Sequence, residues 1–385
     1  MHVLVIPSWY KSRDNPVNGS FFEEQARGLQ KNGLQVGVLC PLFIPFHSKG
    51  AYSFEKYVDQ DLPTYVVTIK GIVPRSISIN YWYIRKKGFE AFINYVESYG
   101  KPDLLHAHTA YFGGIVAEYI SRKTGIPYVL TEHYSPFIKG EITNKRKLNS
   151  AVNAIKNAKL SIVVSNSFRN DLSKKLGLQT EIFKVIPNLV NSTFFQENRL
   201  NSIDCDGHVV FFSNSFLRPI KNHKLIIDAF KIFVQSWPNA TLIIGGDGLL
   251  GEDLRAYTEE NNLSEKVVFT GLLSREEVRK KLNECHIFLS SSLYETFSVV
   301  LIEAMAVGRP VITTDSGGPR DFVNEDNGSI VKSWDAVDYA QEMLNMVNKY
   351  NSFNQVKISD YCRNRFSENV IIDQLLKVYE GISDS

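Results

Sequence analysis

The sequence has few cysteines and no long apolar run. Cysteine occurs four times in 385 residues, at positions too scattered for a disulfide framework or a zinc-binding cluster: Cys40, Cys205, Cys285 and Cys362. No apolar stretch reaches the roughly 18 residues of a membrane-spanning helix, so none is predicted. Residues 1–7 lack the basic leader of a signal peptide and predict a buried strand. These absences predict a cytoplasmic protein with reduced thiols.

Internal repeats and low-complexity tracts are also missing, whereas charge is unevenly distributed. Residues 1–200 hold 25 Lys and Arg against 15 Asp and Glu, a balance of +10; residues 201–385 hold 18 against 26, a balance of −8. A basic half favours an anionic partner, such as an anionic bilayer, a phosphorylated acceptor or a nucleic acid. Ordinary solvated charge is the alternative. Nucleic acid is the weakest of these partners, because no basic and aromatic nucleic-acid motif is present.

Length and apolar patterning predict two α/β domains. A chain of 385 residues, 44% of them apolar, is long for one core. Short apolar runs alternate with helical patterns, which predicts doubly wound parallel sheets with helices on both faces. The predicted strands are 3–6, 35–39, 65–69, 104–107, 128–131 and 161–164, then 209–212, 240–245, 266–270, 287–290 and 310–314. A polar stretch, 196–207, is predicted to link the two domains.

The segment from Ser291 to Pro310 contains Glu295 and Glu303, eight positions apart with an apolar run between them. Eight helical residues rise about 12 Å, which suits a ribose at one end and a hexose at the other. Carboxylates accept hydrogen bonds from sugar hydroxyls, and the amides of a helix start face a diphosphate. The pattern predicts a site for a polyhydroxylated anion.

Two cations, Arg218 and Lys221, follow the first predicted strand of the second half. In a loop before a helix they can clamp a diphosphate leaving group and neutralise the charge that develops as a glycosidic bond breaks. Two surface cations near a turn are the alternative interpretation.

These motifs resemble the Glu-x7-Glu signature of retaining glycosyltransferases with two facing Rossmann-like domains, the GT-B fold of glycosyltransferase family 4 and the group 1 glycosyl transferases. The resemblance extends over nearly the whole chain. It implies an acceptor-binding domain over residues 1–195, a nucleotide-sugar-binding domain over 208–365, and a C-terminal helix within 366–385 that packs back on the first domain.

The resemblance also implies roles for individual residues. Glu295 would contact the transferred sugar and Glu303 the ribose, while Lys221 and Arg218 would hold the diphosphate. The family arginine usually lies five positions before the lysine, where this chain has Phe216.

A second departure from the family pattern follows Glu295. The family usually has glycine after Glu-Thr-Phe, whereas here Ser298 follows Thr296 and Phe297. A hydroxyl at a helix start can still cap the helix or meet phosphate, so all three residues are expected to bind the donor.

Glycine-rich turns follow predicted strands in both halves. Gly246-Asp247-Gly248 opens a Gly-x-Gly-x-x-Gly match, but no acidic residue ends the next predicted strand, so a dinucleotide-binding dehydrogenase is poorly supported. The family has Gly-Asp-Gly at this place, which implies a turn near the nucleotide. Gly19 precedes the first predicted helix, where backbone amides could approach a phosphate or sugar. Structural turns are the alternative at both places.

Histidines end two predicted strands of the first half. His106 and His108 share one face, a spacing seen in metal pairs, but no further ligand follows at a suitable spacing, so no metal is expected. His133 matches the family histidine that faces the donor sugar. Ser165 and Asn188 match family positions that line the cleft, and His108 is a further candidate for the acceptor or cleft, with a structural role as the alternative. The Asp204-Cys205-Asp206 sequence resembles a metal-binding Asp-x-Asp but is interpreted as solvated linker carboxylates.

The predicted helix 81–99 carries Arg85, Lys86 and Lys87 among aromatic residues that include Trp82. This mixture suits docking on a membrane surface. A helix that buries its aromatics in the first domain is the alternative.

The resemblance therefore implies a retaining, metal-independent glycosyltransferase without a cofactor. Its partners would be a nucleotide-sugar donor and a glycolipid or surface-polysaccharide acceptor, with an anionic membrane surface as a further partner on the cytoplasmic side. A sugar-nucleotide epimerase or hydrolase would need a carboxylate base or an in-line water that the sequence does not reveal. A binding protein without catalysis would be favoured by loss of Glu295, Glu303 or Lys221, and all three are present.

Overall fold

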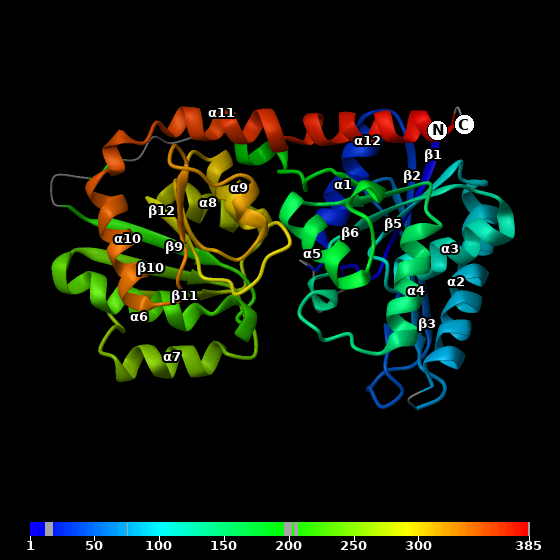
Figure 1. Cartoon of the computed structure of the whole chain (residues 1–385), viewed down its shortest axis with the longest axis horizontal. Helices are drawn as coiled ribbons and strands as arrows, with labels where there is room; N and C mark the ends of the chain where they lie inside the picture. Colours follow the sequence, from blue (N-terminus) through cyan, green and yellow to red (C-terminus); the bar gives the residue numbers. More distant parts are fainter. Residues whose placement is uncertain (12–17, 75, 196–201, 204–206, 384–385) are drawn as a thin grey trace. The chain divides into compact units, whose positions relative to one another are not determined.

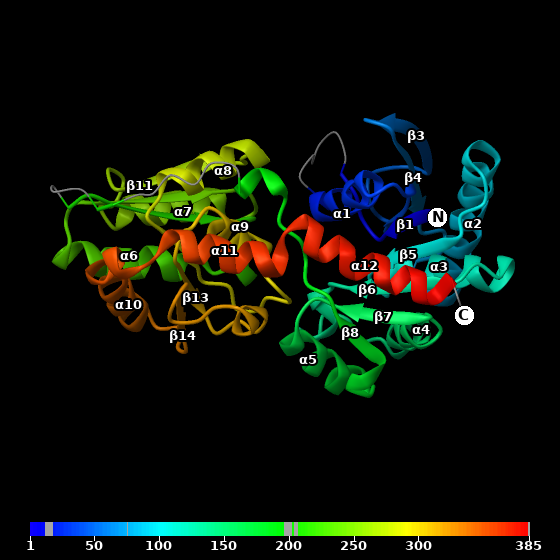
Figure 2. The same ribbon diagram turned by 90° about the horizontal axis from the view of Figure 1, so that it is seen from above.

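The structure is a computed structural model that describes residues 1–11, 18–74, 76–195, 202–203 and 207–383. Contacts within the chain define two compact units, the first made of Met1–Leu189 and Glu368–Ser385, the second of Val190–Ser367. Each unit contains one sheet with helices on both faces, so the predicted α/β class is confirmed (Figures 1 and 2). The predicted linker, with Asp204 and Asp206, lies mostly outside the described residues.

The first unit is built on an eight-stranded sheet in the order β3-β4-β2-β1-β5-β6-β7-β8. All neighbours pair in parallel except β3 and β4, which form a hairpin. The strands are β1 (His2–Pro7), β2 (Gln35–Ile44), β3 (Ser53–Asp59), β4 (Leu62–Lys70), β5 (Leu104–His108), β6 (Tyr128–Glu132), β7 (Leu160–Val163) and β8 (Phe183–Val185). The chain reverses direction across the sheet between β1 and β5, the kind of switch point at which ligands bind in such folds.

The described part of the first unit contains the α-helices α1 (Ser20–Lys31), α2 (Ile77–Tyr99), α3 (Phe112–Thr124), α4 (Lys145–Lys156), α5 (Asn166–Leu176) and α12 (Glu368–Ser383). Helices α2, α3 and α4 pack together on one face of the sheet, and α1 contacts α12 on the other (Figures 1 and 2). The apolar side chains of β1, α1 and α12 share one buried core, which includes Val5, Phe22 and Leu375. Because β1 is buried over its whole length, its sequence is an almost continuous apolar run.

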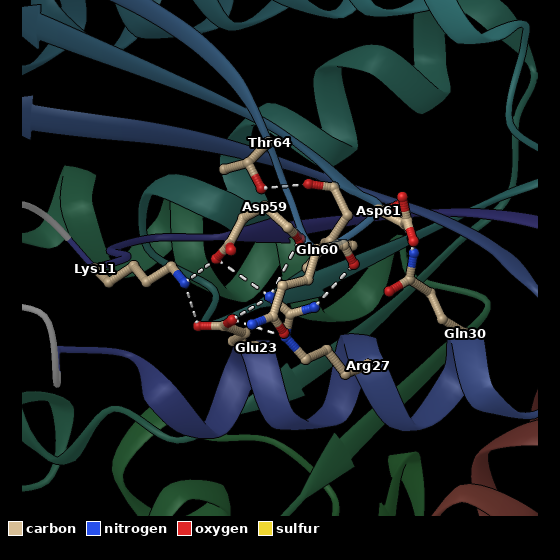
Figure 3. A network of polar contacts seen from close by, with 9 residues as sticks. Lys11, Glu23, Arg27, Gln30, Asp59, Gln60, Asp61 and Thr64 are labelled. Carbon is tan, nitrogen blue, oxygen red and sulfur yellow. Dashed lines mark hydrogen bonds and ion pairs between the residues drawn. The ribbon is translucent and has the colours of Figure 1, made fainter. Parts of the chain in front are cut away.

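A network of charged side chains fastens the β3–β4 hairpin to α1 (Figure 3). Lys11 lies 2.7 Å from Glu23 and also pairs with Asp59, while Arg27 lies 2.6 Å from Glu23 and 3.2 Å from Asp59. Arg27 further donates to the main-chain carbonyls of Asp59 and Gln60. Two cations and two carboxylates thus alternate, and the tip of the hairpin is held by backbone as well as side-chain contacts.

The second unit is built on a six-stranded parallel sheet in the order β11-β10-β9-β12-β13-β14. Its strands are β9 (Val209–Asn214), β10 (Ala240–Gly245), β11 (Val267–Gly271), β12 (Ile287–Ser290), β13 (Val311–Thr314) and β14 (Gly328–Val331). The switch point lies between β9 and β12. The loops that leave these two strands carry Lys221 and Glu295, respectively.

Among the described residues, the α-helices that cover this second sheet are α6 (His223–Ser236), α7 (Gly251–Glu260), α8 (Arg275–Glu284), α9 (Val299–Ala306), α10 (Ala336–Asn348) and α11 (Gln355–Phe366). Helices α6, α7 and α10 lie on one face, and α8, α9 and α11 on the other (Figure 1). Local sequence fixes several helix starts. Ser274 and Glu277 form a reciprocal capping box at α8, and the Asp335 side chain caps α10.

No helix among the described residues has both the length and the apolar character needed to cross a bilayer.

Candidate active site

The loops after β9 and β12 meet at the switch point of the second sheet. Lys221 ends a short 3₁₀ turn (Pro219–Lys221), and Asn222, with φ of 49°, turns the chain into α6. Glu295 is fixed by its backbone, because its N–H donates to Ser316 O at 2.7 Å and its carbonyl accepts from Gly318 N–H at 2.9 Å. Both side chains are therefore placed by short, hydrogen-bonded segments at the carboxyl edge of the sheet.

Lys221 and Glu295 form an ion pair. The Lys221 Nζ lies 2.6 Å from Glu295 Oε1, which also accepts a 2.7 Å hydrogen bond from Ser292 Oγ. Ser291 Oγ donates to the carbonyls of Lys221 and Asn222, at 2.9 Å each. Ser291 thus joins the cation loop to the carboxylate loop, and Ser292 holds the Glu295 carboxylate from within the same loop. A phosphate group and a sugar hydroxyl could be held there at one point, the first by the ammonium and the second by the carboxylate.

A small polar cavity of about 10 Å³ lies beside this pair, lined in part by Ser213, Asn214, Ser290 and His223. His223 is buried, and its Nε2 lies 3.1 Å from Ser215 Oγ. Burial, together with the nearby Lys221, lowers the pKa of His223 to about 4, so the ring is neutral near pH 7. Sequence reasoning missed His223, because a histidine at a helix start carries no signal of what it will touch.

Glu303 lies on α9 and is fully buried. Its Oε1 pairs with Nη1 of Arg275, the first residue of α8. Burial raises the pKa of the Glu303 carboxyl, and Arg275 opposes that rise. Arg275 was not predicted, since it lies 28 positions from Glu303 and only the packing of α8 beside α9 brings the two together.

The three residues that follow Glu295 are buried or half-buried. Thr296 is half-buried, and Phe297 is buried against Phe322 and Phe366, with ring centroids 5.1 and 5.6 Å apart. Ser298 starts α9 with φ of 84°, a left-handed conformation that explains why glycine is usual at this position. Its hydroxyl is buried and makes no capping bond.

Several buried side-chain atoms that follow the strands at the carboxyl edge of the second sheet have no hydrogen-bond partner among the described residues. Among the described residues of the second unit, every buried side-chain nitrogen or oxygen without a hydrogen-bond partner lies after β9, β12 or β13: His223 Nδ1, Ser298 Oγ, Glu303 Oε2 and Ser316 Oγ. Folded proteins satisfy nearly all such groups, so unsatisfied ones require an explanation. A polar ligand at this edge would supply the missing partners.

Gly246 and Gly248 follow β10 and press against the loop that leads to Lys221. Their φ angles are 116° and 156°. A Cβ at Gly246 would lie 1.9 Å from Ser215 O, and one at Gly248 would lie 2.6 Å from Leu217 O. Close backbone approach thus accounts for both glycines. Arg218, next to Leu217, is exposed, with its guanidinium 5.0 Å from the Phe216 ring centroid.

The predicted residues of the first unit follow its strands. His108 ends β5, His133 follows β6, Ser165 follows β7 and caps α5 by accepting from Phe168 N–H at 3.0 Å, and Asn188 follows β8 and is half-buried. Because the carboxyl ends of parallel strands share one edge, these residues lie along the same edge of the sheet.

Gly19 lies before α1, with φ of 74°. A Cβ there would lie 3.1 Å from the Phe22 ring and 3.3 Å from Trp9 O, so close packing as well as the positive φ favours glycine.

His133 is held by a second histidine. Its Nε2 lies 3.0 Å from His108 Nδ1, and the two rings stack with centroids 5.3 Å apart. His108 is fully buried and stacks in turn on His106, which contacts Tyr379 of α12 and Thr131. Burial lowers the pKa of His133 to about 3, so this ring is neutral near pH 7. His133 Nδ1 has no hydrogen-bond partner among the described residues.

No group of three or more His, Cys, Asp or Glu side chains that could hold a metal ion occurs in the part of the chain that the structure describes.

Two family models match the chain. The model described as glycosyl transferases group 1 matches residues 196–365, and that of glycosyltransferase family 4 matches residues 19–194. The chain belongs to the GT-B glycosyltransferases. The family predicted from Glu295, Glu303 and Lys221 is therefore confirmed.

Known proteins similar to this glycosyltransferase agree with that assignment. Bacillus subtilis (strain 168) TuaC, whose name assigns it to teichuronic acid biosynthesis, is 28% identical over 86% of this chain and 85% of its own length. Sucrose-phosphate synthase from Thermosynechococcus elongatus superposes with a TM-score of 0.76 at 17% identity, covering 99% of both chains. Anabaena HepE, solved in complex with UDP, superposes with a TM-score of 0.75 at 19% identity, covering 99% of this chain and all of HepE.

Proposed function

We propose that this glycosyltransferase moves a sugar from a nucleoside-diphosphate sugar to an acceptor hydroxyl with retention of configuration. The observation that carries the proposal is the Lys221–Glu295 pair at the switch point, together with buried polar atoms after β9, β12 and β13 that have no hydrogen-bond partner among the described residues. A cation and a carboxylate 2.6 Å apart suit a sugar phosphate, which presents negative charge next to hydroxyl donors. HepE, which shares the fold, has been solved with UDP and with UDP-glucose, and this supports a nucleotide-sugar donor.

In the proposed reaction, the acceptor oxygen attacks the anomeric carbon on the face from which the diphosphate departs. The bond between that carbon and the phosphate oxygen breaks, and the acceptor proton passes to the departing phosphate. Lys221, with Arg218 beside it, stabilises the charge that grows on this phosphate. Glu295 accepts hydrogen bonds from the sugar, and Glu303 from the ribose. Side-chain cations would do the work that a metal does in other transferases, so we propose that the reaction is metal-independent.

His133 is proposed to bind a hydroxyl of the transferred sugar. Its neutral ring has one nitrogen engaged by His108 and the other without a partner among the described residues. A neutral imidazole can donate or accept one hydrogen bond at that nitrogen, which suits a hydroxyl better than a phosphate.

The acceptor is proposed to be a glycolipid or a surface-polysaccharide intermediate at the cytoplasmic leaflet. TuaC supports the polysaccharide, since its name assigns it to teichuronic acid biosynthesis. A basic and apolar surface on the first unit supports the leaflet. Trp82 and Ile79 on α2 are 57% and 43% exposed, and the Lys86 ammonium lies 5.5 Å from the Trp82 ring centroid. From position 62 to 89 the sequence has five basic residues and no acidic one.

Thermal-shift measurements with UDP, GDP and ADP and their sugars test the donor proposal, because a ligand that binds the folded state raises Tm by mass action. A specific rise with one nucleotide, lost in Glu303→Gln, is the expected result. No shift with any of them would contradict the proposal. Product analysis with and without acceptor then separates transfer from hydrolysis or epimerisation, and turnover without acceptor would favour those alternatives.

A further inference from the structure

Glu303 is a buried carboxylate with two different oxygens. The side chain is 1% exposed. Oε1 accepts from Arg275 Nη1, whereas Oε2 has no hydrogen-bond partner among the residues that the structure describes. One oxygen is therefore already used within the protein, and the other is open to a ligand.

Arg275 is the charged group that favours the ionised form of Glu303, in which both oxygens accept hydrogen bonds. Burial of a carboxyl in apolar surroundings raises its pKa and favours the neutral form, which has lost part of its acceptor capacity. Among the described residues, Arg275 from α8 and Cys362 from α11 are the titratable groups with an electrostatic interaction with Glu303. Cys362 donates to the Ile302 carbonyl at 3.1 Å, and burial raises the pKa of its thiol, so the thiol stays neutral. The positive charge beside Glu303 comes from Arg275.

The Arg275 side chain is itself fixed in place. It is the first residue of α8, directly after the Ser274 capping box, so its backbone is held by the helix start. Its guanidinium lies 5.0 Å from the centroid of the buried Phe194 ring. The side chain is 34% exposed, and it thus runs from the surface of the second unit to a carboxylate in its interior.

We propose that Arg275 is a positioning residue that sets how Glu303 recognises the ribose of the nucleotide. It engages Oε1 and leaves Oε2 as the oriented, charged acceptor for a ribose hydroxyl. The inference rests on the proposed function, since it takes the ligand to be a nucleoside diphosphate. The inference adds Arg275 of α8 to the ribose site that Glu303 of α9 forms. It predicts that discrimination between ribose and 2′-deoxyribose depends on Arg275.

The test measures binding by calorimetry for the wild type and Arg275→Gln. The probes are UDP, GDP and ADP and their 2′-deoxy forms, of which the pair with the tightest ribonucleotide is followed in detail. A hydrogen bond to a charged acceptor is worth about tenfold or more in affinity. We expect the wild type to prefer the ribonucleotide by about that factor, and Arg275→Gln to lose most of the preference at pH 7. In the variant, affinity should also rise with pH, because without Arg275 nothing opposes the rise that burial causes in the pKa of Glu303.

Three further variants keep the test decisive. Lys280→Gln removes an exposed cation from the same helix and should behave as the wild type. Arg275→Lys should retain most of the ribose preference if charge is what matters. In a Glu303→Gln background, Arg275→Gln should add no further loss of preference.

The inference would be overturned if Arg275→Gln bound with unchanged preference, or lost affinity equally for both sugars at every pH. If Arg275→Gln failed to fold, a folded Arg275→Lys that had lost all preference for the ribonucleotide would count against the inference. A wild type that binds none of the nucleotides would instead contradict the proposed function itself, and the inference with it.

Discussion

At the scale of single residues, Lys221 offers the most direct test of the site. Its ammonium has Glu295 as partner on one side and the proposed diphosphate on the other. Replacement by alanine should lower the rate of sugar transfer by about 100-fold or more, because a group that stabilises the leaving charge acts mainly in the transition state. Steady-state kinetics with the nucleotide sugar identified by thermal shift would measure this effect.

The matched control for this prediction is Lys224→Ala. Lys224 is an exposed lysine three positions away that pairs with Asp228 and Tyr257 instead. It should keep full activity. Equal activity of both alanine variants, with both folded, would remove Lys221 from the proposed mechanism.

Two glycines allow conformational strain to be separated from close packing. Gly246 and Gly271 both have positive φ, 116° and 73°, but a Cβ at Gly246 would lie 1.9 Å from Ser215 O whereas one at Gly271 would meet nothing within 4 Å. Gly271→Ala should therefore lower the free energy of unfolding by about 1 kcal/mol, the cost of the left-handed backbone alone. Gly246→Ala should cost about 3 kcal/mol or more, because backbone must also move.

Chemical denaturation of the two variants would measure the difference. Equal losses of stability would show that the loop after β9 can move to accommodate the added methyl group. Close packing would then not explain the glycine at position 246.

At the scale of elements, the sequence predicts the strands that form apolar runs and misses those that do not. All eleven predicted strands are present, because runs such as residues 3–6 and 287–290 are apolar and buried on both faces. The hairpin strand β3 was missed, since its sequence places Glu55 and Lys56 in the middle and leaves Phe54 and Val58 exposed. Strands β8 and β14 were missed because one has three residues and the other begins with glycine.

The same distinction holds for the candidate site. Glu295 and Glu303 were predicted from their local spacing along one loop and one helix, and Lys221 from its place with Arg218 after a predicted strand. The Arg275–Glu303 and His108–His133 pairs join different elements, so no local period signals them. His108 was predicted from its place at the end of a strand, but its contact with His133 depends on the register of β5 against β6.

The charged network on the β3–β4 hairpin predicts a pH dependence of stability. The hydrogen bond from Lys11 is the main cause that lowers the pKa of Asp59 below its usual range. A carboxyl whose pKa is lower in the folded than in the unfolded state stabilises the fold above its unfolded pKa, about 3.9, and this stabilisation is lost as the pH falls through the folded value. Asp59→Asn should therefore lower the free energy of unfolding by about 1 kcal/mol at pH 7.

Urea denaturation at pH 7 and near pH 3 would test this. The gap between wild type and Asp59→Asn should narrow at the lower pH. The control is Asp373→Asn, which removes an exposed carboxylate that pairs with Lys377 one turn away on α12 and should have little effect at either pH. A gap that stays constant with pH would mean that Asp59 acts through packing and not through its charge.

At the scale of the whole molecule, the division of charge is a property that no single motif explains. Most of the basic half, residues 1–189, lies in the first unit, which also exposes Trp82, Ile79 and Ile72. The second unit exposes large apolar side chains too, including Trp334 and Leu249, but it belongs to the acidic half. If apolar exposure alone attracted the protein to a membrane, both units would bind. If basic charge is also needed, the first should dominate.

Vesicle sedimentation distinguishes these cases. The wild type should bind vesicles of phosphatidylcholine with phosphatidylglycerol, and bind pure phosphatidylcholine weakly, because each lysine near an anionic surface contributes about 1 kcal/mol. The double variant Trp82→Ala, Lys86→Ala should weaken anionic-vesicle binding by about tenfold, through loss of one interfacial aromatic and one cation. The matched variant Trp334→Ala, Lys332→Ala removes an exposed tryptophan and lysine from the second unit and should leave binding unchanged.

Added salt should weaken the wild-type interaction, since exposed charges are screened within about 10 Å at 0.1 M. Equal binding to neutral and anionic vesicles, or equal losses in the two double variants, would mean that the basic surface of the first unit does not direct the protein to the bilayer.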